Sequence, residues 1–361
     1  MSTPTLTPVE HGRPDERPGQ RPAQRALLWT GGVLGAALIA WCGLQAADLF
    51  ATSPETKDHD YGAAGTVELM ADGPVTVSVG ADDAVLVTER NRTGFGDSTY
   101  TGDFTSTNGK GRLVVENRCD RWWGSTSCQA GLDVTVPAGT AVIVRSTFGA
   151  VAVSDVSGPV EVRTGDGRVE VSDVDGDVLA ATGSGAVLID GVRGSLSATT
   201  SDGAVEVANV TGDVLARSGS GKVLVDGGRQ VEARTLDGAV TVTASRGAVS
   251  ATSGSGAVSV EDVAGDVEAK TSDGAVHVQS VDGNVNADSG SGSVQVEGAR
   301  GDVTATTSDG PVTVRGAGDP VVLTIFTSDG RTTVEGATDP TARRAVVIRS
   351  GSGDVAYLGP R

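Results

Sequence analysis

The sequence predicts an all-β fold: a single-domain β-solenoid or β-roll built from coils of about 18 residues, preceded by one N-terminal transmembrane helix. Three observations lead to this class. Glycine recurs every 18 residues over nearly half of the chain. Between the glycines, valine and alanine alternate with polar residues, which is the period of a half-buried strand. The 361 residues include 52 glycines and only 3% aromatics, so the core must be thin and built from small side chains.

The N-terminal part predicts a membrane anchor. Residues 1–25 are polar and proline-rich, and we expect a disordered cytoplasmic tail. Residues 26–47, ALLWTGGVLGAALIAWCGLQAA, carry no charge and would span about 33 Å as a helix, enough to cross a bilayer core. Arginines precede this stretch and acidic residues dominate 48–64, a juxtamembrane linker. The positive-inside rule then predicts a single-pass cell-membrane protein with a cytoplasmic N-terminus and an extracytoplasmic β domain.

A cleaved signal peptide is the alternative interpretation of the same stretch. Its apolar run is longer than the usual 7–15 residues, and the small-x-small cleavage pattern is poor around residues 45–47. We therefore expect an uncleaved anchor that binds the chain to the membrane through residues 26–47. Cys42 is not preceded by the small residue that lipoprotein attachment requires, because Trp41 occupies that position.

Residues 65–145 contain alternating strand patterns separated by irregular loops, and we expect an N-terminal β region that caps the repeats. Cys119 and Cys128 lie nine residues apart in this region and predict a disulfide outside the membrane. Trp122 and Trp123 lie between them. Two interpretations of these tryptophans stay open: they pack over the open end of the core, or they form an aromatic contact patch for a glycan or a protein.

Residues 146–358 carry the repeat and, at the end, an expected C-terminal cap. A second glycine series lies half a period from the first, so each 18-residue coil consists of two strand-plus-turn units. Eleven such rungs would make a rod of about 50 Å. Longer insertions containing Pro320 and Pro340 interrupt the period near the end and predict the cap. The main series of turn glycines is Gly149, Gly167, Gly185, Gly203, Gly221, Gly238, Gly256, Gly274, Gly292 and Gly310.

Two kinds of turn alternate along the main series, which makes the true period 36 residues. Asp-Gly turns contain Asp166, Asp202, Asp237, Asp273 and Asp309. Gly-Ser-Gly turns contain Ser184, Ser220, Ser255 and Ser291. The alternation fails only near the end, where Asp329 follows Asp309 directly and Ser352 comes afterwards.

The repeated aspartates raise the possibility of calcium binding. Calcium β-rolls use the nonapeptide G-G-x-G-x-D-x-U-x, whose aspartates converge from neighbouring turns. Here no G-G-x-G is present, and aspartates on alternate rungs would lie about 9.6 Å apart, too far to share one ion. We interpret Asp273 and its equivalents as turn residues and expect neither a metal nor another cofactor.

The residue pattern also argues against an enzyme. Carboxylates recur periodically, as solvated faces do, and His277 faces outward from a strand pattern, so no catalytic triad can be assembled. The G-x-G strings precede strands and lack a following Gly-Lys-Ser/Thr, so they are not phosphate loops. No small-molecule substrate is evident, and a net charge of −18 argues against nucleic acid.

The chain resembles the bacterial "putative adhesin" family of β-strand-repeat proteins, a domain family of unknown function. The resemblance covers about residues 65–358. It is carried by the anchor, by the loop between Cys119 and Cys128 leading into LDVTVPAGTAVIVRSTFGAVAVSDVSG, and by the iterated SGDV and SDGAV strands. It implies an envelope-facing β-solenoid without catalytic residues.

These expectations together predict a non-catalytic cell-envelope protein that presents its solenoid as an adhesin-like binding or scaffold surface. The expected partner is a cell-wall glycan or an envelope protein. The alternative is a structural or sensory subunit of an envelope-stress response system, in which the cytoplasmic tail contacts a regulator.

Overall fold

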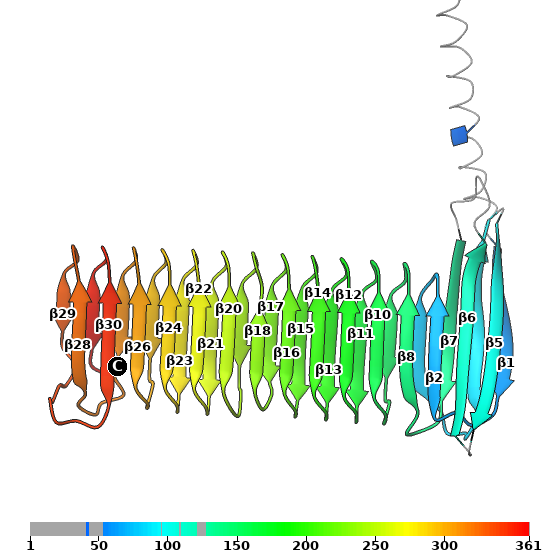
Figure 1. Cartoon of the computed structure of the whole chain (residues 1–361), viewed down its shortest axis with the longest axis horizontal. Coiled ribbons are helices and arrows are strands. Elements are labelled where there is room, and N and C mark those ends of the chain that lie inside the picture. The colour runs from blue at the N-terminus through cyan, green and yellow to red at the C-terminus, as the bar shows by residue number, and fades with distance from the viewer. Residues whose placement is uncertain (1–40, 43–52, 95, 108–109, 121–127, 361) are drawn as a thin grey trace, which may run out of the picture.

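The structure, a computed structural model, describes residues 41–42, 53–94, 96–107, 110–120 and 128–360. Within these residues 31 strands form two long sheets, one of 16 and one of 15 strands (Figure 1). The all-β class is therefore confirmed. Most of the predicted membrane stretch, 26–47, lies outside the described residues. A search of the described part of the chain found no helix long and apolar enough to cross a membrane.

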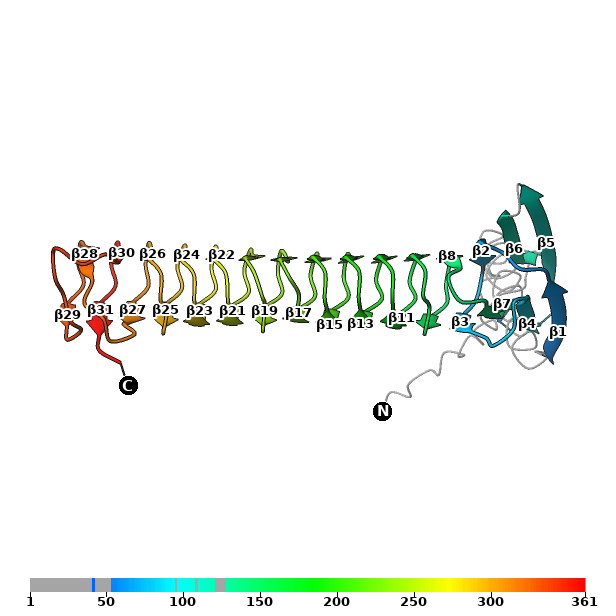
Figure 2. The ribbon, with the colours of Figure 1, turned by 90° about the horizontal axis from the view of Figure 1, so that it is seen from below.

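The two sheets form the two faces of a solenoid, because each coil gives one strand to each sheet (Figure 2). The strands of the 15-stranded sheet that make up its regular part are β8 (Ala141–Ser146), β10 (Val160–Thr164), β12 (Val178–Thr182), β14 (Leu196–Thr200), β16 (Val214–Ser218), β18 (Val231–Arg234), β20 (Val249–Ser253), β22 (Val267–Thr271), β24 (Val285–Ser289) and β26 (Val303–Thr307). Their partners in the 16-stranded sheet are β9 (Val151–Ser154), β11 (Val169–Val174), β13 (Val187–Val192), β15 (Val205–Val210), β17 (Val223–Gly227), β19 (Val240–Thr243), β21 (Val258–Val263), β23 (Val276–Val281), β25 (Val294–Glu297) and β27 (Val312–Arg315).

Neighbouring coils pair in parallel with a register of 18 residues, as between β10 and β12, where Val160 lies beside Val178. The single 17-residue step occurs where β15 pairs with β17: Ala208 lies opposite Asp226, but Val210 lies opposite Gly227. In the coils before this step, one extra residue stands between these two positions. It has a left-handed backbone and bulges out of the ladder, as Asp173 does with φ of 54°. The shorter step lacks this bulged residue, so the ladder continues on both sides of it.

The core is a double row of small side chains between the sheets. In most strands of the regular part, valine at the first position and valine or alanine at the third position are buried, and the residues between them face outward. Stacking repeats this pattern every 4.8 Å, so each valine packs on the equivalent valine of the next coil. The scarcity of aromatic residues follows from this geometry, because a larger side chain would force the two sheets apart.

The turn glycines stack directly on one another at one edge of the solenoid. A Cβ atom built on Gly167 would lie 1.7 Å from the carbonyl oxygen of Gly149, and one on Gly256 would lie 1.9 Å from that of Gly238. No side chain fits at these distances, so glycine is required because the backbones of successive coils touch. The periodic glycine therefore reports a close approach of two coils.

A ladder of buried hydroxyl groups runs beside the glycine stack. Three residues before each turn glycine stands a serine or threonine, such as Thr271 before Gly274. Thr271 Oγ1 accepts a hydrogen bond from the Gly274 amide at 3.2 Å and donates one to the Gly256 carbonyl of the preceding coil at 2.9 Å. Each hydroxyl thus satisfies two backbone groups that the tight turn leaves without a strand partner. The members of the ladder are Ser146, Thr164, Thr182, Thr200, Ser218, Thr235, Ser253, Thr271, Ser289, Thr307, Ser350 and Thr327.

At both ends of the solenoid the coils stack in an order different from their order in the chain. The coil of β30 (Ala345–Ser350) and β31 (Val355–Leu358) lies between β26/β27 and the outermost coil, β28 (Val322–Thr327) and β29 (Thr332–Val334). At the other end the coil of β2 (Thr66–Ala71) and β3 (Val75–Val79) lies between β8/β9 and the coil of β6 (Lys110–Asp120) and β7 (Cys128–Val136). The first and last coils of the chain are therefore held on both sides by hydrogen-bonded neighbours, which prevents them from fraying as free ends.

This exchange of coils explains why the 36-residue alternation slips in the sequence. Along the rod the turn positions run Asp309, Ser352, Asp329, so aspartate and serine still alternate in space. Ser352 donates a hydrogen bond to Asp309 at 3.3 Å. The glycine stack has the same order, since a Cβ on Gly353 would meet Gly310, and one on Gly330 would meet Gly353.

Three further strands complete the N-terminal end: β1 (Ser53–Tyr61), β4 (Val85–Thr93) and β5 (Asp97–Thr107). β4 pairs antiparallel with β7 and with β1, which is the edge of the 16-stranded sheet. β5 and β6 pair antiparallel and put β5 at the edge of the other sheet. The solenoid has 14 stacked coils, each with one strand in each sheet, because β5 of the 15-stranded sheet and β1 and β4 of the 16-stranded sheet do not belong to a coil. At 4.8 Å per coil the rod is about 62 Å long.

Candidate binding groove

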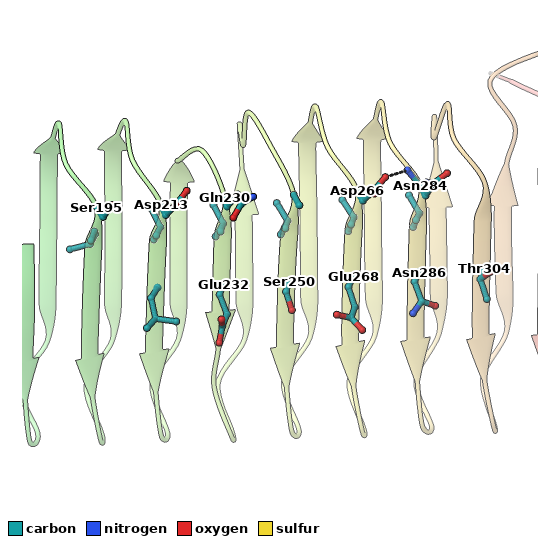
Figure 3. A pocket seen from close by; sticks show the side chains of 18 of the residues that line it. Ser195, Asp213, Gln230, Glu232, Ser250, Asp266, Glu268, Asn284, Asn286 and Thr304 are labelled. Atoms are coloured by element: carbon teal, nitrogen blue, oxygen red, sulfur yellow. Dashed lines mark hydrogen bonds between the residues drawn. The ribbon is translucent and has the colours of Figure 1, made fainter. Parts of the chain in front are cut away.

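The outer face of the 15-stranded sheet carries an open groove of about 930 Å³ that crosses the seven strands from β14 to β26 (Figure 3). Two rows of outward-facing residues line it. The row that precedes the strands consists of Ser195, Asp213, Gln230, Ala248, Asp266, Asn284 and Asp302. The row on the strands consists of Leu215, Glu232, Ser250, Glu268, Asn286 and Thr304.

Strand geometry makes this groove. Residues two apart on a strand point to the same side and lie about 6.7 Å apart, whereas the residue between them points inward. The inward residues here are the first core residues of each strand, such as Val249 and Val267, so between the two rows only backbone forms the floor. Because the coils are in register, the rows stay parallel over about 29 Å.

Hydrogen bonds between successive coils hold the row that precedes the strands. Asp266 Oδ1 accepts a hydrogen bond from the backbone amide of Asn284 at 2.7 Å (Figure 3), and Asn284 Oδ1 accepts one from the amide of Asp302 at 2.9 Å. Asp302 in turn accepts one from the amide of Ala345 at 2.8 Å. One oxygen of each side chain is thus used to join coils, and the rest of the group remains on the groove wall.

The groove is rich in hydrogen-bond acceptors. Its lining contains five carboxylates and no basic side chain. Basic residues next to the groove pair with some of these carboxylates: Glu232 contacts Arg217 at 2.8 Å and Arg234 at 3.0 Å, and Glu268 contacts Lys270. At Asp213, Oδ2 pairs with Arg229, whereas Oδ1 is buried and has no hydrogen-bond partner within the described part of the chain.

Towards the N-terminal end the same face becomes less polar. A second hollow of about 460 Å³ covers β8, β10, β12 and β14, and its lining includes Ile143, Pro159, Leu179 and Leu196. The two hollows share Ser195 and Leu196. The face therefore presents a continuous track of about 43 Å over ten coils, apolar at one end and acceptor-rich at the other.

Next to the apolar end of the track, a carboxylate is bound by two arginines. The carboxylate of Glu68 on β2 is nearly buried and receives hydrogen bonds from Arg112 and Arg145 on the strands at either side. The hydrogen bond from Arg112, followed by that from Arg145, holds the pKa of Glu68 below its usual value, although burial acts in the opposite direction.

The predicted disulfide is present. Cys119 on β6 and Cys128 on β7 are bonded, with their Cα atoms 6.0 Å apart. The bond joins the two sheets at the outermost N-terminal coil, since β6 and β7 belong to different sheets. Trp122 and Trp123 lie outside the described residues, so the aromatic contact patch stays a prediction.

The aspartates of the main turns lie as the turn interpretation predicts. Ser291 donates a hydrogen bond to Asp273 at 3.1 Å, and Ser184 donates one to Asp166 at 2.6 Å. Asp202 and Asp309 likewise accept a hydrogen bond from the serine of the next coil, and along the rod a serine separates each turn aspartate from the next one. Within the described ranges there is no group of three or more His, Cys, Asp or Glu side chains that could hold a metal ion.

A buried polar network in the N-terminal strands did not appear in the sequence analysis. Glu89 on β4 is only 3% exposed; it bonds to the His59 Nε2 atom at 2.6 Å and accepts a hydrogen bond from Asn91 at 2.8 Å. Asn117 on β6, fully buried, donates to Asn91 at 2.7 Å and so joins the two sheets. The ring of His59 stacks on that of Tyr100 at 4.2 Å.

A sequence signal for this network exists in the strand register. Every second residue of β4 up to Asn91 is buried, starting with Val85 and Val87. Glu89 and Asn91 are the next two residues in this alternation and therefore also point inward. Polar residues in phase with core valines predict buried polar contacts, because side chains two apart share a face. Near the same network the Tyr100 and Tyr61 hydroxyls are 2.8 Å apart, and burial, followed by this hydrogen bond, raises the pKa of Tyr100 far above its usual value.

Comparison with known proteins gives limited information. No family model matches the sequence, and no curated protein matches it. Among solved structures, a "putative cell adhesion protein" from Clostridium sporogenes is 8% identical and has a TM-score of 0.22, covering 85% of this chain and 100% of its own. A "putative adhesin" from Bacteroides fragilis is 10% identical, with a TM-score of 0.30, and the match covers 85% and 97%. Similarity at this level carries no argument about the function of this chain.

Proposed function

We propose that this protein is a non-catalytic binding protein of the cell envelope whose solenoid binds an extended polymer along the face of the 15-stranded sheet. The observation that carries the proposal is the groove: two straight rows of mostly polar side chains that cross the coils from β14 to β26, with a backbone floor. The two rows repeat their positions at every coil, and this regular spacing suits a chain of repeated units.

The chemistry of the lining indicates the class of polymer. Carboxylate and amide oxygens accept hydrogen bonds, so the partner must carry many donors. A cell-wall glycan has hydroxyl and amide donors along its whole length and fits this requirement. An anionic polymer does not, because the groove carries carboxylates and the chain has a net charge of −18.

The predicted anchor supports a location at the cell surface. If residues 26–47 span the membrane with a cytoplasmic N-terminus, the disulfide between Cys119 and Cys128 forms in an oxidising compartment, where such bonds persist. The rod then extends from the membrane and presents the groove to the cell wall.

Co-sedimentation of the purified full-length chain in detergent with insoluble cell-wall glycan tests the proposal. We expect binding that Glu268→Gln weakens about 5-fold to 10-fold, the effect of replacing a charged hydrogen-bond acceptor by a neutral one. Glu206→Gln is the matched control, because Glu206 also pairs with a lysine, Lys222, but lies on the opposite face. EDTA should not change the binding. Absence of binding, or equal losses in the two variants, would refute the proposal.

The second hypothesis, a structural or sensory subunit of an envelope-stress system, depends on residues 1–25, which lie outside the described residues. It predicts that deletion of these residues abolishes a signalling phenotype while the solenoid is still displayed at the surface.

A further inference from the structure

The outermost coil at the C-terminal end leaves two strand edges open (Figures 1 and 2). β28 ends the 15-stranded sheet and β29 ends the 16-stranded sheet. In β28 the amide of Val322 donates to Arg344 on the inner side. Because neighbouring residues of a strand point their backbone groups to opposite sides, those of Leu323 and Ile325 face outward.

The loop after β29 covers only the beginning of this edge. Val321 donates a hydrogen bond to the carbonyl of Ala337 and accepts one from the amide of Asp339, so its outward groups are satisfied. No described segment pairs with the outer side of β28 from residue 323 onward. The free edge thus consists of two short strands, one at the end of each sheet.

The core also ends there without a cover. Leu323 and Ile325 lie in the inward register of β28, pack on the core and are only partly buried. Val334 of β29 lies in the register of Tyr357, whose side chain is buried, yet Val334 itself is 48% exposed. One further coil of the same cross-section would bury all three side chains.

The edges at the two ends of the rod differ in charge. β1 at the N-terminal end has the sequence SPETKDHDY and carries charged residues of both signs, Glu55, Lys57, Asp58 and Asp60, a pattern that prevents strand addition. β28 and β29, with the sequences VLTIFT and TTV, carry no charge. In a chain with a net charge of −18, an uncharged edge is where a second copy can approach with the least repulsion.

We infer that two copies of this chain dock end to end through β28 and β29. A two-fold axis perpendicular to the sheets pairs β28 antiparallel with β28 of the second copy, and it pairs the two β29 strands in the same way. The interface is then isologous, continues both sheets at once and covers the open core with an identical cross-section. The two rods point in opposite directions, so anchored copies would join two facing surfaces.

Sedimentation of the purified full-length chain in detergent over a range of concentrations measures the association. Thr324→Lys adds a positive charge on the outer face of the sheet at β28. In the docked pair this lysine would lie opposite the same lysine of the second copy, and the two charges would repel each other. Thr304→Lys is the matched control, since Thr304 occupies the same column on β26, two coils further in. We expect a wild-type dimer, an unchanged control and at least about tenfold weaker association of Thr324→Lys. A monomeric wild type, or equal association of the two variants, would overturn the inference.

Cysteine cross-linking tests the geometry separately. In a Cys42→Ser background, oxidation of Thr324→Cys should give a covalent dimer and oxidation of Thr304→Cys should not. Equal cross-linking at both positions would show association through the sheet face and refute end-to-end docking. Thr304 lines the groove, but both experiments measure association of the chain with itself and not glycan binding, so failure of glycan binding leaves their outcome unaffected.

Discussion

Replacement of Thr271 by valine tests the role of the hydroxyl ladder in holding the coils together. Valine has nearly the shape of threonine, so the packing of this buried side chain is preserved. The variant lacks the group that accepts from the Gly274 amide and donates to the Gly256 carbonyl. Both backbone groups lose their partner in a turn that the next coil partly covers.

The expected cost follows from the two unpaired groups. Leaving a buried donor or acceptor without a partner costs about 1–3 kcal/mol, and partial access of water to the turn keeps the total near that range. Since about 1.4 kcal/mol corresponds to a factor of ten, amide exchange by local opening should become about 5-fold to 150-fold faster at Gly274.

Hydrogen exchange is the appropriate assay, because a stack of coils need not unfold in one step and a single unfolding energy is then not defined. Thr271→Ser keeps the hydroxyl and should exchange nearly as the wild type, since serine occupies the same position in several coils. Thr252→Val changes an outward threonine on β20 and should have little effect.

The reasoning would be refuted if Thr271→Val and Thr252→Val gave the same exchange at the turn. The stacking of coils would then depend on the strand ladders and the valine core alone.

Three further predictions concern other parts of the molecule. Ala244 has a left-handed backbone with φ of 54°, which costs about 1–2 kcal/mol; Ala244→Gly should therefore raise the stability of its coil by about 0.5–1 kcal/mol, measured by denaturation and local exchange. Glu89→Ala removes the partner of His59 and Asn91 and should weaken the N-terminal strands by about 2–3 kcal/mol, seen as faster exchange in β1. The pKa of Glu68 is lower in the folded than in the unfolded chain, so its charge stabilises the fold above the unfolded pKa, and this contribution is lost as the pH falls through the folded pKa. The difference in denaturation midpoint between the wild type and Glu68→Gln should therefore shrink as the pH is lowered over this range.

Each of these predictions has its own control. Ala181→Gly, on an ordinary strand, should destabilise, and a stabilising effect there would mean that backbone strain is not the cause at Ala244. Unchanged exchange in β1 would show that Glu89 does not hold that strand. A midpoint difference for Glu68→Gln that is independent of pH would remove charge as the reason for the contribution of Glu68.

Much of the solenoid follows from short stretches of sequence. Val267 and Ala269 alternate with Glu268 and Lys270, which predicts both the strand and its buried face, and the structure confirms both. The interpretation of Asp273 as a turn residue agrees with its bond to Ser291. The serine or threonine three residues before each turn glycine was available in the sequence but was not interpreted, because its partner lies on another coil.

The functional surface could not be predicted in the same way. Glu232 and Glu268 have the sequence context of any outward strand residue, and what makes them line a groove is the parallel stacking of their coils with the row at Asp266. The network of His59, Glu89 and Asn117 likewise joins residues of three strands that are far apart in the chain.

The sequence by itself determined the period and the inward face of the repeated strands, because these are local consequences of strand geometry. The cause of the repeated glycine is instead a tertiary contact, since the backbones of successive coils touch at the turns. Only the tertiary structure decided the order of the coils at both ends. All coils have nearly the same cross-section, so local preferences allow any of them to stack on any other. Hydrogen bonding along the whole stack selects the order in which the coil of β30 and β31 lies between the coil of β26 and β27 and the outermost coil of β28 and β29. That order leaves the uncharged strands, and not the last residues of the chain, at the end of the rod.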